Sequence, residues 1–195
     1  MPEAVSPSGH PLDAMLAVSD VLTNERYARI YARVLELETP TVAEIAEGLD
    51  SSTTTVYEDV SHLTEIAILE RVTETQPHRY RARAVEMTVQ TGEGTYRISP
   101  TLLVALARRD RNENLRLYVD RHGIAGLATA IDSARKYVRG RTSARLLARE
   151  QGVPVLEAET ILQELREIIL EVEPEVDESL DVEELDDAVG ELSEE

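Results

Sequence analysis

Hydroxyl-bearing side chains crowd one short stretch of the sequence, SSTTTVYEDVSHL, which begins at residue 51. Three consecutive threonines suit a strand, but either leading serine can cap a helix, and Val56, Val60 and Leu63 then recur at spacings of four and three. The stretch therefore predicts a capped helix over 51–64 that buries these apolar residues. Its free side would carry Ser52, Thr54, Thr55, Glu58, Ser61 and His62.

These side chains are suited to contacting a nucleic acid. Hydroxyls both donate and accept, so they contact phosphates or base edges without strong preference, and Glu58 can accept from the amino group of cytosine. Glu58 can equally be a solvated surface charge, and Asp59 beside it would repel phosphate. A metal site at Glu58, Asp59 and His62 is the remaining alternative, but the chain has four scattered His and no Cys, so no metal is predicted.

Arginines form a second group shortly after this helix. The runs LERVTET and HRYRARA, residues 69–75 and 78–84, alternate with the period of a strand and are separated by a turn. Arg79, Arg81 and Arg83 then share one strand face, with Arg71 at the base of the same hairpin. Such guanidinium groups suit phosphates or a minor groove; the alternative is a solvated strand face.

Two further helices are predicted before the hydroxyl-rich one. Helical spacing of apolar residues follows Thr23, which can act as a cap, and Pro40 ends that helix. A short helix starts at Thr41 and stops near Gly48. Helix, short helix, capped helix and hairpin is the order of a winged helix-turn-helix, in which the third helix enters the major groove of DNA.

The second half of the sequence is predicted to be mainly helical. A second, less clearly marked hairpin surrounds GEG at 92–94, which precedes a strand and is therefore a turn rather than a phosphate cradle. Helices follow from Ser99, with Gly140 ending a long one, Thr142 capping the next and Pro154 opening the last. The run LLAREQGVPVLEAETILQEL loosely copies a second helix-turn-helix, but its exposed glutamates suit packing or a partner more than DNA. Nearby cations either extend a DNA footprint or form a solvated face; they are Arg135, Lys136, Arg139, Arg141 and Arg145.

Composition excludes several classes of protein. The chain has 195 residues, 42% of them apolar, and no Cys, so we expect neither disulfides nor thiolate chemistry. No apolar run is long enough for a membrane span, and the N-terminus does not resemble a signal peptide, so a cytoplasmic protein is expected. No nucleophile–base pairing or cofactor motif is recognisable, so we predict neither an enzyme nor a bound cofactor.

Charge is distributed unevenly in an acidic chain. Asp and Glu number 38 against 20 Lys and Arg, a net charge of -18, and only Lys136 is lysine. Such acidic, lysine-poor composition is typical of proteins from extreme halophiles, because carboxylates keep a chain soluble in high salt. From Glu171 onward there are 13 acidic residues and no basic one, whereas residues 71–149 have a local excess of basic residues. The acidic tail is expected to be solvated, or to compete with DNA for the basic surface.

Part of the sequence resembles a known family. The motifs LTNERYARIYARVLE, TVAEIAEGLDSSTTTVYEDVSHL, ILERV and HRYRA, within residues 22–84, are similar to the DNA-binding domain of TrmB-like archaeal transcription regulators. The resemblance implies a winged helix-turn-helix and a regulator of transcription. The remainder departs from that family, being too short for its sugar-binding domain, and looks like a helical domain found in uncharacterised haloarchaeal proteins.

The expected fold is therefore mainly α with small β. We predict a flexible segment at 1–19, a winged helix-turn-helix domain at 20–98, a helical dimerisation or regulatory domain at 99–171 and a largely disordered acidic tail at 172–195. The expected function is sequence-specific binding of double-stranded DNA as a homodimer, with recognition helix 51–64 in the major groove and wing 69–83 on the backbone or minor groove. The alternative is a winged-helix scaffold that binds proteins of the transcription machinery without reading bases.

Overall fold

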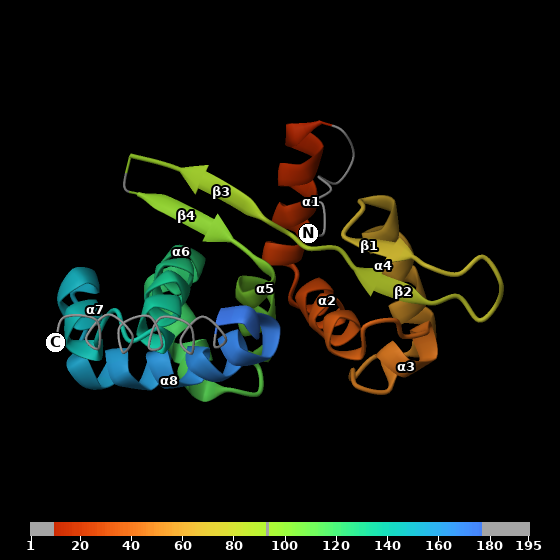
Figure 1. Ribbon diagram of the computed structural model, residues 1–195. Coiled ribbons are helices and arrows are strands. Elements are labelled where there is room, and N and C mark those ends of the chain that lie inside the picture. The colour runs from red at the N-terminus through yellow and green to blue at the C-terminus, as the bar shows by residue number, and fades with distance from the viewer. Residues whose placement is uncertain (1–9, 93, 177–195) are drawn as a thin grey trace, which may run out of the picture. The chain divides into compact units, whose positions relative to one another are not determined.

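The computed structural model describes residues 10–92 and 94–176, and it is mainly helical with two small antiparallel sheets (Figure 1), which confirms the expected fold class. The chain divides into two compact units, Met1–Arg111 and Asn112–Glu195. The division falls after the helix that follows Ser99 rather than before it, because that helix packs against the helices of the first unit. Most of the predicted acidic tail, from residue 177 onward, lies outside the described residues.

The first unit contains five helices and four strands among its described residues. Its core is apolar and almost free of aromatic rings, with Ile30, Tyr31, Ile45, Leu63 and Leu103 fully buried. Helix α2 is central, since it packs against α1, α4, α5 and β2. In chain order the elements are α1 (Pro11–Thr23), α2 (Glu25–Leu37), α3 (Val42–Ala46), α4 (Thr53–Glu65), β1 (Leu69–Arg71), β2 (Tyr80–Ala82), β3 (Met87–Gln90), β4 (Thr95–Ile98) and α5 (Pro100–Arg108).

Helix α1 covers residues 11–19 of the segment 1–19 that was predicted to be flexible, and residues 1–9 lie outside the described residues. The side chain of His10 caps it by accepting a hydrogen bond from the amide of Leu12, and Pro11 occupies the first turn. Its buried face is made of Ala14, Ala17, Val18 and Val21, small residues that give a weak apolar period. Thr23 is the last residue of α1, so it does not cap α2; the cap is the next residue, Asn24, which accepts from the amide of Arg26.

Caps define the beginning of α3 and α4, as the sequence predicted. Thr41 and Glu44 form a reciprocal capping box at α3. At α4 the cap is Ser52, whose hydroxyl accepts from the amide of Thr55 at 3.2 Å, so the run of threonines is the first turn of a helix. Helix α4 ends at Glu65, and Ala67, two residues later, adopts a φ of 60°, in the left-handed region, where the chain turns toward β1.

The two sheets are both hairpins. Strand β1 pairs with β2 so that Glu70 lies opposite Arg81, and Thr41 forms an isolated bridge with Arg79, which attaches the segment before α3 to the start of β2. The predicted second hairpin is also present, with β3 and β4 paired from Met87 opposite Ile98 to Gln90 opposite Thr95.

The described part of the second unit is helical. It comprises α6 (Glu113–Val138), α7 (Ala144–Gln151) and α8 (Val155–Val172), and α8 packs against both of the others. Gly123 interrupts α6 with a φ of 68°, and Gly152 ends α7 in the left-handed conformation. The cap of α7 is Ser143 rather than the predicted Thr142. The buried faces meet through residues such as Leu127, Ile131, Ile161, Leu162 and Leu165.

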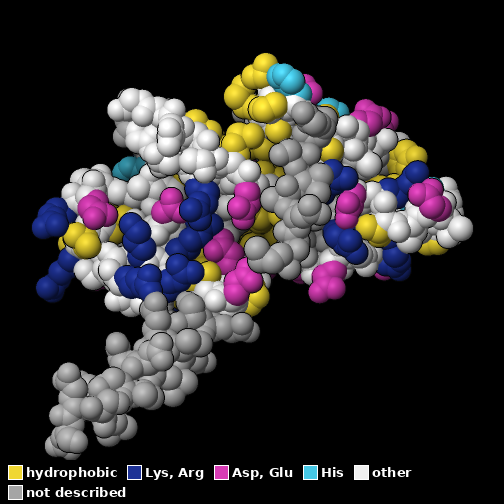
Figure 2. All heavy atoms as spheres, turned by 45° about the horizontal axis from the view of Figure 1, so that its top comes forward, with side chains coloured by type: hydrophobic (Ala, Val, Ile, Leu, Met, Phe, Trp, Pro, Cys, Tyr) yellow, Lys and Arg dark blue, Asp and Glu magenta, His cyan; other side chains and the backbone are white. Residues whose placement is uncertain are grey.

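Figure 2 shows Lys and Arg side chains gathered on the second unit, whereas on the first unit they alternate with Asp and Glu side chains. Among the described residues, no helix combines the length and apolar character needed to cross a membrane.

Candidate nucleic-acid interface

The outward face of α4 is polar and open to solvent. Val56, Val60 and Leu63 are buried as predicted, which turns Thr54, Glu58 and Ser61 to the exposed side of the helix. These three predicted site residues therefore share one face. Helix α4 carries no Lys or Arg, so any attraction of this face to an anion must come from hydroxyl groups, the helix N-terminus or neighbouring elements.

Tyr57 belongs to the same exposed side and was not among the predicted site residues. Its side chain is 58% exposed, although large aromatic rings are usually covered. Burial raises the pKa of Tyr80 in β2, with a smaller contribution from Tyr57, and α4 itself contacts β1 of the hairpin. Tyr57 could have been predicted as a surface residue from the sequence, because the helical period of Val56, Val60 and Leu63 places its ring outside the core.

Ser52 and Thr55 are partly committed to structure. The Ser52 hydroxyl accepts the capping hydrogen bond, and the two hydroxyl groups lie 2.9 Å apart. Ser52 is exposed and Thr55 is half-buried. The Ser52 hydroxyl is therefore fixed at the N-terminus of α4. Because it already takes part in two hydrogen bonds, it has little capacity left to bond to a ligand.

His62 does not lie on the exposed face with Ser61. Its ring is tilted against Tyr27 of α2, with centroids 5.3 Å apart, and its Nε2 lies 3.4 Å from a carboxylate oxygen of Asp20 in α1. Asp59, beside Glu58, is buried and accepts hydrogen bonds from the guanidinium of Arg26. His62 and Asp59 thus tie α4 to α1 and α2, because both side chains face the helices behind α4.

The arginines of the β1–β2 hairpin are paired with carboxylates. Arg81 and Arg83 approach the two oxygens of Glu70 at 3.3 and 3.5 Å, which confirms that they share a strand face. Arg71 lies 3.7 Å from Glu74 in the following loop. Since Arg71 and Arg81 remain about half exposed, with 45% and 57% of the side chain open, their pairs belong to the weak surface class.

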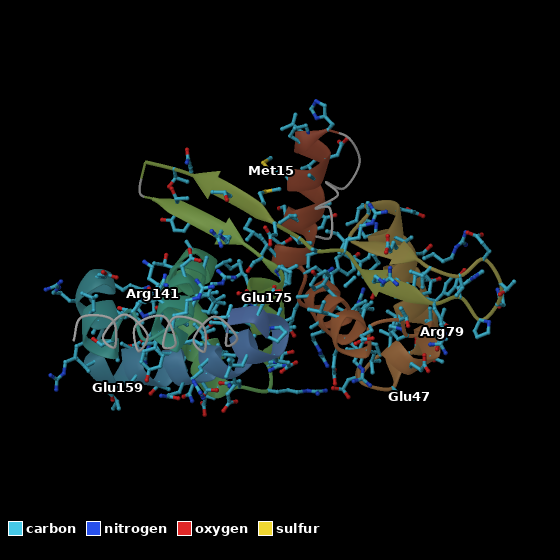
Figure 3. All side chains as sticks on the ribbon, viewed as in Figure 1. Met15, Glu47, Arg79, Arg141, Glu159 and Glu175 are labelled. Carbon is cyan, nitrogen blue, oxygen red and sulfur yellow. The ribbon has the colours of Figure 1, made fainter. Side chains whose placement is uncertain are left out.

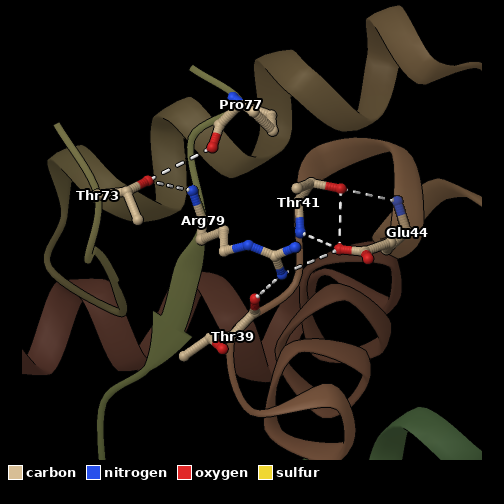
Figure 4. Close-up of polar contacts among 6 residues, drawn as sticks. All are labelled: Thr39, Thr41, Glu44, Thr73, Pro77 and Arg79. Atoms are coloured by element: carbon tan, nitrogen blue, oxygen red, sulfur yellow. Dashed lines mark hydrogen bonds and ion pairs between the residues drawn. The ribbon is translucent and has the colours of Figure 1, made fainter. Parts of the chain in front are cut away.

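Arg79, labelled in Figure 3, differs from the other hairpin arginines in that its guanidinium contacts the segment around α3 (Figure 4). Its Nη1 donates to the backbone carbonyl of Thr39 at 2.7 Å and lies 3.5 Å from Glu44. Its backbone amide donates to the hydroxyl of Thr73 at 2.8 Å. The predicted contact residue Arg79 therefore connects β2 to the loop between α2 and α3, because its strand runs beside that loop.

The electrostatics of this region reinforce these attachments. Hydrogen bonds from the backbone and side chain of Thr41 hold the pKa of Glu44 below its usual range, and Arg79 lowers it further. The hydrogen bond with Asp59 raises the pKa of Arg26, so that guanidinium stays charged. Within residues 10–92 and 94–176, no group of three or more His, Asp or Glu side chains is placed to hold a metal ion.

The structure therefore divides the predicted site residues into four groups. Thr54, Glu58 and Ser61 form one outward surface; Arg71, Arg81 and Arg83 lie on the adjoining hairpin, which follows α4 directly and contacts it. Ser52 and Thr55 form the helix cap. His62 and Arg79 are turned toward neighbouring elements. We call the first two groups, together with Tyr57, the α4–hairpin surface.

Comparison with known proteins bears on the other unit. Residues 109–174 match a family of unknown function, DUF7437. No curated protein matches the chain, and no solved structure does. The matched region covers α6, α7 and α8, and the α4–hairpin surface lies outside it.

Proposed function

We propose that residues 20–98 form a winged helix-turn-helix and that the protein is a sequence-specific DNA-binding transcription regulator. The observation that carries the proposal is the α4–hairpin surface: a capped helix with an exposed polar face, followed directly by an antiparallel hairpin that bears arginines. The bridge between Thr41 and Arg79 supports it further, because it adds a third, minimal strand to the hairpin, as winged helices have.

In this proposal α4 enters the major groove. Thr54 and Ser61 contact base edges or phosphates, and Glu58 accepts from a cytosine amino group. Tyr57 adds an aromatic surface and a hydroxyl. The helix N-terminus, capped by Ser52, supplies partial positive charge where α4 itself has no cation.

The hairpin arginines contact the sugar–phosphate backbone or the minor groove. Exposed ion pairs contribute only about 0–1 kcal/mol, so Arg81, with 57% of its side chain exposed, can exchange Glu70 for a phosphate at small cost. In molar salt the Debye length is about 3 Å, which screens the repulsion between DNA and the acidic chain. Short-range hydrogen bonds then provide most of the affinity.

Selection of bound genomic fragments, followed by gel shifts in potassium chloride, tests the proposal. The double variant Thr54→Ala and Ser61→Ala should lose discrimination between selected and mixed duplexes. Arg81→Ala with Arg83→Ala should weaken binding to both. The control is Thr88→Ala on β3, an exposed threonine outside the surface. Selection that enriches no sequence would contradict the proposal.

A protein-binding scaffold is the second candidate. Three observations favour it: the hairpin arginines are already paired with carboxylates, α4 exposes Glu58 and Glu65, and Tyr57 is an aromatic ring of the kind enriched at protein interfaces. Under this alternative, Tyr57→Ala would abolish capture of transcription proteins by the purified chain, while duplex binding would be absent in the wild type.

We further propose that the regulator acts as a homodimer, because two half-sites give specificity. The second unit supports self-association: Leu156 is 74% exposed at the start of α8, and Leu117 and Val155 are exposed nearby. A hollow of about 280 Å³ lies beside Leu156, with Leu117, Tyr118, Pro154 and Ile161 in its walls. In a two-fold symmetric dimer, the exposed leucine of each copy could enter the apolar hollow of the other copy, so the same surface would serve on both sides.

A further inference from the structure

The end of α6 and the following α7 carry concentrated positive charge in an acidic chain. Residues 133–149 contain six Lys or Arg and no Asp or Glu, against a net charge of -18 for the whole chain. Figure 2 shows Lys and Arg side chains gathered on this unit, and Figure 3 labels Arg141 beside α6 and α7. We call the four residues Lys136, Arg139, Arg145 and Arg149 the α6–α7 cation cluster.

The cluster residues lack carboxylate partners, as Arg111 and Arg166 also do, whereas most arginines of the described chain are paired. In the first unit, most arginines lie within ion-pair distance of a carboxylate. Examples are Arg26 with Asp59 and Arg81 with Glu70. Arg135, next to the cluster, is held by Asp132 and Glu173. Across the described part of the chain, by contrast, no carboxylate forms an ion pair with a residue of the cluster. Its charge is therefore available to an external anion.

The surroundings of the cluster suit a phosphodiester. Arg145 lines an open hollow of about 790 Å³ whose walls also carry Tyr137, Ser143, Thr160 and Gln163. Hydroxyl and amide groups beside arginine are the side chains that contact phosphate and sugar oxygens. Glu159 lines the same hollow, and Glu150 is adjacent to Arg149 in sequence. Asp132 and Glu173 lie next to the cluster as well, but both are already paired with Arg135.

We infer that the α6–α7 cation cluster binds the backbone of a nucleic-acid duplex without reading its sequence. Duplex DNA carries about one charge per 1.7 Å, a density that competes effectively with dissolved anions. Three of the four cluster residues are arginines, whose planar fork matches two phosphate oxygens. The inference goes beyond the proposed function, because it assigns nucleic-acid contact to the second unit and does not depend on α4.

The test compares full-length variants by titration of a mixed-sequence duplex over a series of potassium chloride concentrations. Arg145→Ala with Arg149→Ala removes two exposed charges from α7, where alanine favours the helix. Arg116→Ala with Arg166→Ala removes two exposed charges from α6 and α8, outside the cluster. We expect the first pair to weaken binding about tenfold or more. The slope of log affinity against log salt should become shallower by about 1 to 2. The second pair should change neither quantity appreciably.

The variant Arg145→Lys with Arg149→Lys should retain the salt slope, because the charge remains, and should lose less affinity than the alanine pair, because only the forked hydrogen bonding is lost. Equal losses in the two alanine pairs, or no loss in either, would overturn the inference. Displacement of the duplex by polyglutamate at matched charge would also overturn it, since the cluster would then be a surface for acidic proteins. Circular dichroism of each variant verifies that the helices are intact.

Failure of this inference can be told apart from failure of the proposed function. If Arg81→Ala with Arg83→Ala leaves duplex binding unchanged while the α7 pair abolishes it, the α4–hairpin proposal fails and the cluster remains. If the α7 pair leaves duplex binding unchanged while the Arg81 and Arg83 pair abolishes it, the cluster inference fails and the proposed regulator function stands. A wild-type chain that binds no duplex at any salt concentration removes both.

Discussion

Asp59 in α4 accepts two hydrogen bonds from Arg26 in α2, from Nε and from Nη2, the latter at 2.9 Å. The carboxylate is buried, with 7% of its side chain exposed, whereas Arg26 is 46% exposed. A buried charge needs a partner, so this pair fixes the rotation of α4 on α2. That rotation determines which side chains of α4 face outward, and therefore which of them can contact a duplex.

Replacing Arg26 with alanine should destabilise the first unit. The change leaves the Asp59 carboxylate buried without its partner, which costs about 1–3 kcal/mol after allowance for the exposure of Arg26. The measurement is the midpoint of urea unfolding followed by circular dichroism. Arg116→Ala is the matched control, because it breaks only exposed pairs within α6, and it should shift the midpoint little. Equal shifts for the two variants would contradict the structural role of the Asp59 pair.

Arg79 and Arg81 were both predicted as DNA contacts, but we expect their alanine variants to differ. Arg79→Ala should mainly reduce stability, and Arg81→Ala should mainly weaken DNA binding. Arg79→Ala loses a charge-assisted bond to the Thr39 carbonyl, and we expect a loss of about 1–2 kcal/mol of stability. Arg81→Ala removes an exposed pair with Glu70 and should change stability by less than about 0.5 kcal/mol while weakening duplex binding. Unfolding curves and gel shifts on both variants check this. If Arg81→Ala proved the more destabilising, this assignment of roles would be reversed.

The capping box at α3 should make part of the stability dependent on pH. Hydrogen bonds from Thr41 lower the pKa of Glu44, so the unfolded chain binds this proton more readily than the folded one. The contribution is therefore present above the ordinary pKa of glutamate, about 4.3, and is lost as the pH falls through the lower folded value. Glu44→Gln should be less stable than wild type near neutral pH, and the two should converge in acid.

Thermal unfolding of wild type and Glu44→Gln at a series of pH values measures that convergence. Glu47→Gln is the control, since it removes a carboxyl at the end of the same helix but outside the box. A stability difference between wild type and Glu44→Gln that stays constant from neutral pH to acid would show that the carboxylate plays no part.

Local signals in the sequence predicted the elements well. Ser52, Thr41 and Ser99 cap helices where their hydroxyls were expected to, because capping depends on neighbouring backbone amides alone. Helix α1 was missed because alanines and a histidine cap give a faint pattern. Two adjacent residues with hydroxyl groups can each cap the same helix. Thr142 was therefore predicted as the cap of α7, whereas the cap is Ser143.

The site was less predictable than the fold, because it depends on contacts between distant segments. The strand period correctly placed Arg81 and Arg83 on one face, but only the pairing of β1 with β2 brings Glu70 between them. The diversion of Arg79 toward Thr39 similarly arises from a neighbour 40 residues away. His62 was assigned to the free face since nothing in its own helix reveals Tyr27 and Asp20.

The homodimer proposal makes a prediction at Leu156. Substitution by glutamate places a charge on an exposed leucine that the proposed interface would bury against the hollow walled by Leu117 and Tyr118. An unpaired buried charge is strongly unfavourable, so the dimer should dissociate at least about tenfold more readily. Sedimentation equilibrium measures the association.

Leu12→Glu is the matched control for Leu156→Glu, because Leu12 on α1 is exposed to a similar degree and belongs to the first unit. Dissociation by Leu156→Glu alone places self-association on α8. Dissociation by Leu12→Glu alone would move it to the exposed apolar face of α1, where Met15 and Leu16 adjoin Leu12 at helical spacing. A wild-type chain that stays monomeric throughout would remove the dimer altogether, and a single α4–hairpin surface would then have to read its site without a second half.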